Sequence, residues 1–241
     1  MKGLSAHLER SEGYIELCGD VVPYTVFVRK VKYPRIEVST GRVQVIIPRN
    51  FSGGASFLES HRRWLEKKYE IIKNALRDVP KGKVPILGDM WEIRDSNDFQ
   101  LDFNNKCILI NRENPSHKRK LLRKIRELVR RRAKKFVEEF GKEYDVQPNK
   151  IYIRNQKSKW GSCSGNNNLS FNIRTIALPD RLFEYVVFHE FVHLMHKNHN
   201  RIFWSIVKEK FKDLKEIKSE LAKFWFKSLV LERICRPKTS H

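Results

Sequence analysis

Hydrophobic positions in the first half of the chain alternate between the spacing of strands and the spacing of a helix. Apolar and β-branched residues gather in four strand-like segments, and an apolar stripe at helical spacing lies between them. Strands are expected at 21–31, 35–48, 86–93 and 107–110, and the helix is expected at 56–76. This mixture predicts an N-terminal α+β unit over residues 1–114, in which no chemical motif is evident.

Helical spacing dominates the second half. Apolar residues recur at three- and four-residue intervals over 116–144 and again over 206–231, which predicts two amphipathic helices. Between them, Pro179 and Asp180 supply a helix start before a strongly apolar segment. We therefore expect a separate compact domain over residues 115–241 and an α+β fold class for the whole chain.

The apolar segment after Asp180 contains the sequence HEFVH, residues 189–193. On a helix, His189 and His193 lie on one face about one turn apart, where two ring nitrogens can bind one metal ion. Glu190 points near the open coordination position, where a carboxylate can take a proton from water. This arrangement is typical of zincins. The competing interpretation is a buried helix with two hydrogen-bonded histidines, which is costly unless both rings are satisfied.

A catalytic zinc site uses three protein ligands and one open position, so a third donor is required. His199 is our candidate, because Asn198 tolerates the left-handed conformation of a helix end and can turn the chain back toward the metal. His196 is the competitor, but helical rise carries it about 10 Å along the axis from His189, and we expect it near the rim. The 193–199 spacing also matches metzincins, but their turn glycine is replaced here by His196 and no Met-turn follows.

Residues upstream of the motif make the pattern more specific. A Gly/Asn run at 165–168 separates two short strand-like segments and predicts a hairpin. The phrases QKSKWGSCS, LSFNIRTIALP and YVVFHEFVHLMHKNHNRIFW follow one another between residues 150 and 205. Together they resemble the YgjP-like metallopeptidase family, a relative of the SprT and Spartan-type proteases.

The resemblance implies a zincin-like catalytic domain with an HExxH helix and a small antiparallel sheet. It makes His189, His193 and His199 the ligands of a zinc ion and Glu190 the general base. It also implies that one strand flanks the cleft and binds an extended polypeptide substrate through backbone hydrogen bonds. The residues of that strand are Trp160, Gly161, Ser162 and Cys163.

The chain is strongly basic. Lys and Arg total 49 against 28 Asp and Glu, which gives a formal net charge of +21. Such a charge predicts contact with polyanions such as nucleic acid, although a solvated helix face is the more frequent meaning of a charge run. The densest positive surface lies on the 116–144 helix. The candidate nucleic-acid-binding residues there are Arg123, Lys124, Arg130, Arg131 and Lys134.

These features support four functional interpretations. The first is a zinc-dependent peptidase acting on polypeptides, with His196 and Arg174 as candidates for stabilising the oxyanion. The second is a DNA-associated protease acting on bound proteins, from the SprT and Spartan resemblance and the basic surface. The third is a metal-dependent nucleotide pyrophosphohydrolase, for which the sequence shows no phosphate-binding loop. The fourth is a nucleic-acid-binding module with structural zinc, and Glu190 argues against it because such a site does not need that carboxylate.

Cysteine positions and hydropathy bear on the possible cysteine chemistry and on the expected cellular location. The four cysteines, Cys18, Cys107, Cys163 and Cys235, form no CxxC pair and predict neither a zinc ribbon nor a disulfide framework. Cys163 is expected to be structural, because a thiol nucleophile needs an activating base and His189 is better explained as a metal ligand. The sequence has no apolar run of about 18 residues and no signal-peptide pattern, which predicts a cytoplasmic protein without a membrane span.

Overall fold

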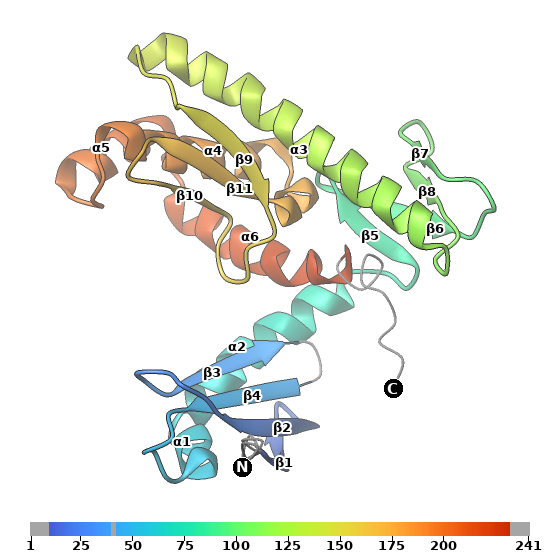
Figure 1. Ribbon diagram of the computed structural model, residues 1–241, viewed down its shortest axis with the longest axis vertical. Helices are drawn as coiled ribbons and strands as arrows, with labels where there is room; N and C mark the ends of the chain where they lie inside the picture. Colours follow the sequence, from blue (N-terminus) through green and yellow to red (C-terminus); the bar gives the residue numbers. More distant parts are fainter. Residues whose placement is uncertain (1–9, 40–41, 232–241) are drawn as a thin grey trace, which may run out of the picture. The chain divides into compact units, whose positions relative to one another are not determined.

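A computed structural model describes residues 10–39 and 42–231 of the chain (Figure 1). Its contacts divide the chain into two compact units, and the division falls between Arg77 and Asp78. The boundary expected after residue 114 does not coincide with this division. The physical reason is that the apolar residues at 84–110 belong to the same buried cluster as the helices that follow them.

The first unit is a four-stranded sheet with two helices against it. Its strands are β1 (Arg10–Leu17), β2 (Asp20–Val28), β3 (Arg35–Ser39) and β4 (Arg42–Ile47), in the order β1-β2-β4-β3. β2 and β4 run parallel, and the other pairs are antiparallel. Val43 and Val45 of the central strand share a buried cluster with Leu58 and Leu65 of the helices. The helix predicted at 56–76 is two helices, α1 (Gly54–Ser60) and α2 (Arg62–Arg77), which are separated at His61.

The second unit begins with another four-stranded sheet. Its strands are β5 (Lys83–Ile86), β6 (Asp89–Arg94), β7 (Gln100–Asp102) and β8 (Cys107–Leu109), in the order β5-β6-β8-β7. The single strand predicted at 86–93 is a hairpin, because Leu87 and Gly88 adopt φ values of 54° and 86° and form a two-residue turn. The backbone N–H of Leu87 donates to the Ile176 carbonyl at 2.6 Å, and that of Gly88 to the Ala177 carbonyl at 3.2 Å. The hairpin tip is thereby joined to the segment that precedes the HEFVH helix.

A three-stranded sheet follows in the chain. Its strands are β9 (Lys150–Arg154), β10 (Gly161–Cys163) and β11 (Asn168–Asn172), in the order β10-β11-β9. β10 and β11 form the predicted antiparallel hairpin, but β9 and β11 run parallel, so the sheet that we expected to be antiparallel is mixed. β10 lies at the edge and pairs with β11 alone among the described strands.

Four α-helices and a short 3-10 helix complete the described part of the second unit. They are α3 (Pro115–Tyr144), η1 (Ile173–Ala177), α4 (Asp180–Met195), α5 (Arg201–Lys210) and α6 (Leu214–Lys227). The predicted C-terminal helix is thus α5 and α6, with a break between them. α4 lies in the core, where Phe188 and Phe191 meet Phe140 of α3 at ring-centroid distances of 4.9 and 5.7 Å. The α+β class is confirmed, and no described helix combines the length and apolar character that a membrane span requires.

Candidate active site

Three histidine side chains converge at the C-terminal part of α4. His189 and His193 lie one helical turn apart on α4, and His199 lies in the segment between α4 and α5. The Nε2 atom of His199 lies 3.1 Å from that of His189 and 3.2 Å from that of His193. Three nitrogens that bind one tetrahedral zinc ion at about 2.0–2.1 Å are roughly 3.3 Å apart. The donor set therefore fits a single metal ion, and these three residues could hold one.

A backbone contact orients the second imidazole. Nδ1 of His193 lies 3.0 Å from the carbonyl oxygen of His196, which only accepts, so Nδ1 carries the proton and donates it. The Nε2 lone pair of a neutral His193 is then directed at the other two rings. The turn that returns His199 differs from our expectation. α4 ends on an extended His196 (φ −128°), and Asn198 is not among the described residues with positive φ.

Burial favours the neutral form of the two imidazoles on α4. It lowers the pKa of His189 to about 4, with smaller contributions in the same direction from His193, His199 and Lys218. It also lowers the pKa of His193. Because a metal binds the unprotonated ring, both shifts favour the form that can coordinate an ion.

Aromatic side chains from α5 hold the three rings together. The Phe203 side chain is fully buried, and its ring centroid lies 5.0, 4.6 and 4.7 Å from those of His189, His193 and His199. Trp204 stacks on His199 at 5.6 Å. This pair therefore packs the ligand segment onto the core.

Glu190 points into the same pocket from the core side. The residue is only 9% exposed, and burial raises the pKa of its carboxyl to about 7, against the opposing effects of Lys159 and the Cys163 backbone N–H. Gly161 lies directly against the Glu190 side chain. A Cβ atom at position 161 would lie 2.6 Å from Cγ of Glu190. The glycine thus permits the edge strand β10 to approach the carboxylate.

The pocket has a volume of about 280 Å³ and brings most of the predicted site residues together. Its lining consists of Lys159, Gly161, Ser162, Cys163, His189, Glu190, His193, Lys197 and His199. Trp160 is not among them. Its ring packs edge-on against Trp225 of α6 at 4.8 Å, so this residue supports β10 from behind.

The two lysines of the lining were not predicted from the sequence. Lys159 lies two residues before Gly161, where the KSK run reads as an ordinary polar loop. Lys197 donates to the Asn167 side chain at 2.5 Å and lies 3.9 Å from the Cys163 sulfur. The thiol of Cys163 has its pKa raised, chiefly by burial, which is consistent with the expected structural role.

Asn172 was also missed, and it positions the loop that leads into β10. Its buried amide donates to the carbonyls of Gln156 and Lys159 at 2.8 Å each, and its Oδ1 accepts from the Arg174 backbone N–H at 3.1 Å. The backbone N–H of Asn172 donates to the Trp160 carbonyl at 2.7 Å. An asparagine at a strand end is common, so no sequence signal distinguished it.

The two candidates for oxyanion stabilisation lie elsewhere. Arg174 is buried, donates to the Ser228 hydroxyl at 2.9 Å and to the Trp225 carbonyl, and lies 3.8 Å above the Trp225 ring. His196 contributes its carbonyl to His193, and its side chain does not line the pocket. Neither residue meets the geometric requirement for that role.

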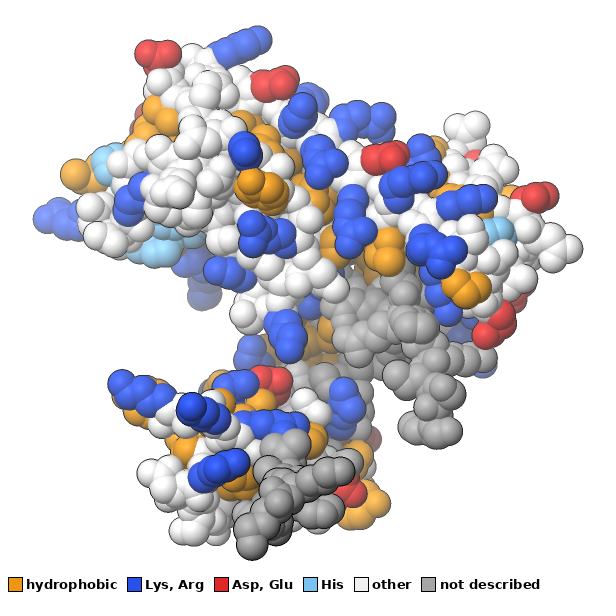
Figure 2. All heavy atoms as spheres, viewed as in Figure 1, with side chains coloured by type: hydrophobic (Ala, Val, Ile, Leu, Met, Phe, Trp, Pro, Cys, Tyr) orange, Lys and Arg blue, Asp and Glu red, His pale blue; other side chains and the backbone are white. Residues whose placement is uncertain are grey.

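The basic residues proposed for nucleic acid form a separate surface. Arg123, Lys124, Arg130, Arg131 and Lys134 are all exposed on α3, and none lines the histidine pocket. Lys and Arg side chains gather along this helix (Figure 2). The structure therefore separates the basic surface from the candidate active site.

Comparison with known proteins finds a family whose model matches this chain. The YgjP-like metallopeptidase domain matches residues 32–224. No curated protein matches the chain. A solved structure, the metallopeptidase zymogen jannalysin of Methanocaldococcus jannaschii, is similar over 37% of this chain and 86% of its own, at 22% identity and a TM-score of 0.33. The match over 32–224 spans most of the chain, so the chain belongs to the YgjP-like metallopeptidase family.

Proposed function

We propose that this metallopeptidase is zinc-dependent, with His189, His193 and His199 as the metal ligands and Glu190 as the general base. The observation that carries the proposal is that Nε2 of His199 lies 3.1 and 3.2 Å from those of His189 and His193, beside a buried carboxylate. Three neutral imidazoles with a further open position are the donor set of a catalytic zinc site. When bound, the ion supplies Lewis acidity to a substrate carbonyl oxygen and to water.

Glu190 moves the proton. Its carboxyl has a pKa of about 7, so near neutral pH it can both accept a proton and release one. As water attacks the scissile carbonyl, Glu190 takes up the proton that the water loses. It then delivers this proton to the leaving amine. A carboxyl with an ordinary pKa would be a weaker base for the first step.

β10 binds the substrate in this proposal. The strand lies at a sheet edge, and its residues Gly161, Ser162 and Cys163 line the pocket next to Glu190. An extended polypeptide can pair with such an edge through backbone hydrogen bonds, which makes binding tolerant of sequence. Trp160 does not line the pocket, and in this proposal it supports the substrate-binding strand through its packing on Trp225.

A nucleotide phosphoanhydride is the second candidate substrate. Lys159 and Lys197 line the same pocket as the histidines and bring positive charge to it, which favours an anionic group. Release of pyrophosphate from nucleoside triphosphates by the metal-loaded protein, without cleavage of polypeptides, would replace the peptidase proposal with this one.

The deciding experiment follows cleavage of an unfolded polypeptide by metal-free protein after addition of zinc. Glu190→Gln is expected to retain stoichiometric zinc and lose about 10²- to 10⁴-fold in turnover, the range for removing a general base. His193→Ala is expected to lose both zinc and turnover. Full activity of Glu190→Gln would contradict the proposed mechanism.

His196→Ala provides a matched control. It removes an imidazole close to the triad but leaves the backbone carbonyl that accepts from His193. The variant is therefore expected to retain zinc binding and activity. Loss of zinc in this variant would mean that the ligand set is wrong.

A further inference from the structure

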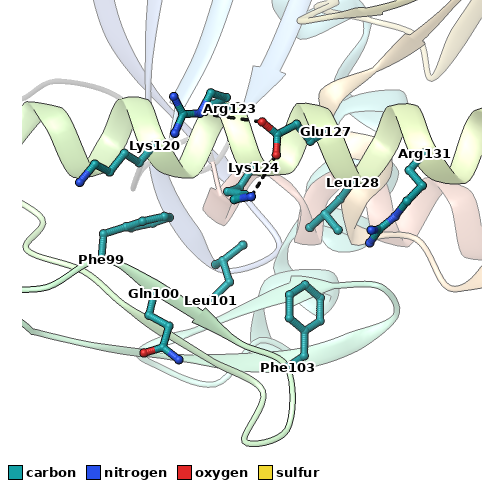
Figure 3. A pocket seen from close by; sticks show the side chains of 10 residues that line it. All are labelled: Phe99, Gln100, Leu101, Phe103, Lys120, Arg123, Lys124, Glu127, Leu128 and Arg131. Atoms are coloured by element: carbon teal, nitrogen blue, oxygen red, sulfur yellow. Dashed lines mark hydrogen bonds and ion pairs between the residues drawn. The ribbon is translucent and has the colours of Figure 1, made fainter.

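A groove runs between one face of α3 and the hairpin of β7 and β8. It has a volume of about 550 Å³ and lies within the second unit. Figure 3 shows side chains from the helix and the hairpin facing one another across it. The lining residues are Phe99, Gln100, Leu101, Phe103, Lys120, Arg123, Lys124, Glu127, Leu128 and Arg131. None of them belongs to the histidine pocket.

The helix side of the groove is a continuous strip. Its residues recur at three- and four-residue intervals from Lys120 to Arg131, which places them on one face of α3. The strip extends about 16 Å along the helix axis. A nucleic-acid strand of that length carries several phosphates.

Positive charge is in excess along this strip. Four cations accompany a single carboxylate, Glu127, which pairs with Lys124 at 3.2 Å and with Arg123 at 3.8 Å. Lys120 and Arg131 have no carboxylate partner within the described part of the chain, and both are exposed. Their charges are therefore available to an anionic ligand.

The hairpin side contributes aromatic rings. Phe103 is 48% exposed although it is a large apolar side chain, and its ring packs edge-on against the buried Trp91 at 5.1 Å. This contact holds Phe103 in place and leaves part of its ring open. Leu128 lies opposite Phe103 on α3, and the half-buried Phe99 lies at the other end of the groove near Lys120 (Figure 3).

We propose that this groove binds single-stranded nucleic acid, with the α3 cations on the phosphates and Phe103 stacked on a base. An exposed ring next to a row of cations matches a polymer in which every unit carries both a phosphate and a flat base. A duplex hides its base faces and offers only phosphates, and an acidic peptide offers only charge. Three of the five cations predicted from the sequence line the groove, namely Arg123, Lys124 and Arg131.

The test measures binding of fluorescent 15-nucleotide oligo(dT) and oligo(U) to the full chain over a range of salt concentrations. Lys120→Glu/Arg131→Glu is expected to weaken binding at least tenfold and to reduce the slope of log affinity against log salt by at least about 1.4. Phe103→Ala is expected to weaken binding roughly 5- to 100-fold with the salt slope unchanged. Binding of either oligonucleotide with these responses supports the proposal and tells DNA from RNA.

Arg130→Glu/Lys134→Glu is the matched control, because it reverses the same charge on the same helix outside the groove. Its fold-loss of oligonucleotide affinity should be at least five times smaller than that of the groove variant. The proposal is overturned if both double variants lose affinity equally, if a duplex of the same length binds as tightly, or if poly-glutamate displaces the oligonucleotide at equal charge. Phe103→Tyr, which keeps the aromatic face, should bind like the unmodified chain, and its failure to do so would also count against stacking.

Discussion

The histidine pocket buries ionisable side chains, whereas the α3 groove exposes its cations to solvent. In the pocket, Glu190 is 9% exposed with a pKa of about 7, and His189 has a pKa of about 4. In the groove, Lys120 and Arg131 remain exposed to solvent. Burial changes proton affinity and suits a site that moves protons. Exposure keeps full charge and long-range attraction, and it suits a surface that binds a polyanion.

Substitutions in the pocket should change stability and chemistry together, since its groups are packed against the core. Substitutions of the groove cations should change binding while leaving the fold intact.

The largest effect is expected from Phe203→Ala. Phe203 is fully buried and contacts all three imidazoles, so its removal creates a cavity directly beneath the triad. The free energy of unfolding should fall by about 3–5 kcal/mol, and zinc affinity should fall as well. Chemical denaturation and zinc titration measure the two effects. Ile202→Ala, at a neighbouring residue that is 56% exposed, should change stability by less than about 1 kcal/mol.

The next largest effect is expected from Gly161→Ala. The added methyl group would lie 2.6 Å from Cγ of Glu190, so the carboxylate or β10 must shift. We expect about 100-fold lower turnover, equivalent to about 2.7 kcal/mol in the activation barrier, with zinc retained. Gly165→Ala is the control, because nothing lies within 4 Å of its added Cβ. Equal activity of the two variants would show that the close approach of β10 to Glu190 is unimportant.

A smaller effect concerns the stability of the metal-free protein against pH. The pKa of Glu190 is raised from 4.5 to about 7, so the folded state holds an extra proton between these values and loses stability as pH rises through them. The pKa of His189 is lowered from 6.5 to about 4, so the unfolded state holds the extra proton and stability falls as pH drops through that window. The two slopes oppose each other between about pH 4.5 and 6.5.

The Glu190→Gln substitution should separate these two opposing contributions to the pH dependence of stability. Above pH 7 the metal-free variant should be more stable than the unmodified protein by on the order of 2 kcal/mol, because a buried charge has been removed. Near pH 4.5 the two proteins should be equally stable. Between pH 6.5 and 4 the variant should lose stability with falling pH, since the His189 contribution is no longer opposed. Parallel stability curves for the two proteins, measured by urea denaturation in a chelator, would contradict the assigned burial of Glu190.

The smallest effect is expected from Lys120→Glu/Arg131→Glu. Both side chains are exposed and make no described ion pair, so the free energy of unfolding should change by less than about 0.5 kcal/mol. Zinc content and peptidase activity without nucleic acid should also be unchanged. Thermal denaturation and metal analysis provide the check. A large loss of stability would mean that the groove cations serve the fold.

Much of the fold was predictable where one local period dominates a long segment. The helix expected at 116–144 is α3, and the hairpin expected around 165–168 is β10 and β11. Shorter elements were missed or merged. β1 and the β5–β6 hairpin depend on two-residue turns at Cys18–Gly19 and Leu87–Gly88, and neither pair is a strong turn signal in the sequence. The division at Arg77 depends on which buried cluster each strand joins, and that is a property of packing.

In the site, local spacing was enough to bring His189, His193 and Glu190 together, because a helix repeats every 3.6 residues wherever it lies. The position of His199 follows from a helix end at His196 and from packing on Phe203, and the apolar periodicity of the segment predicts neither of them. The contact of Gly161 with Glu190 joins residues 29 positions apart, and the α3 groove joins Phe103 to a helix face that begins 17 residues later. Such contacts depend on which surfaces pack against each other in the core. The periodicity of the sequence does not predict that packing.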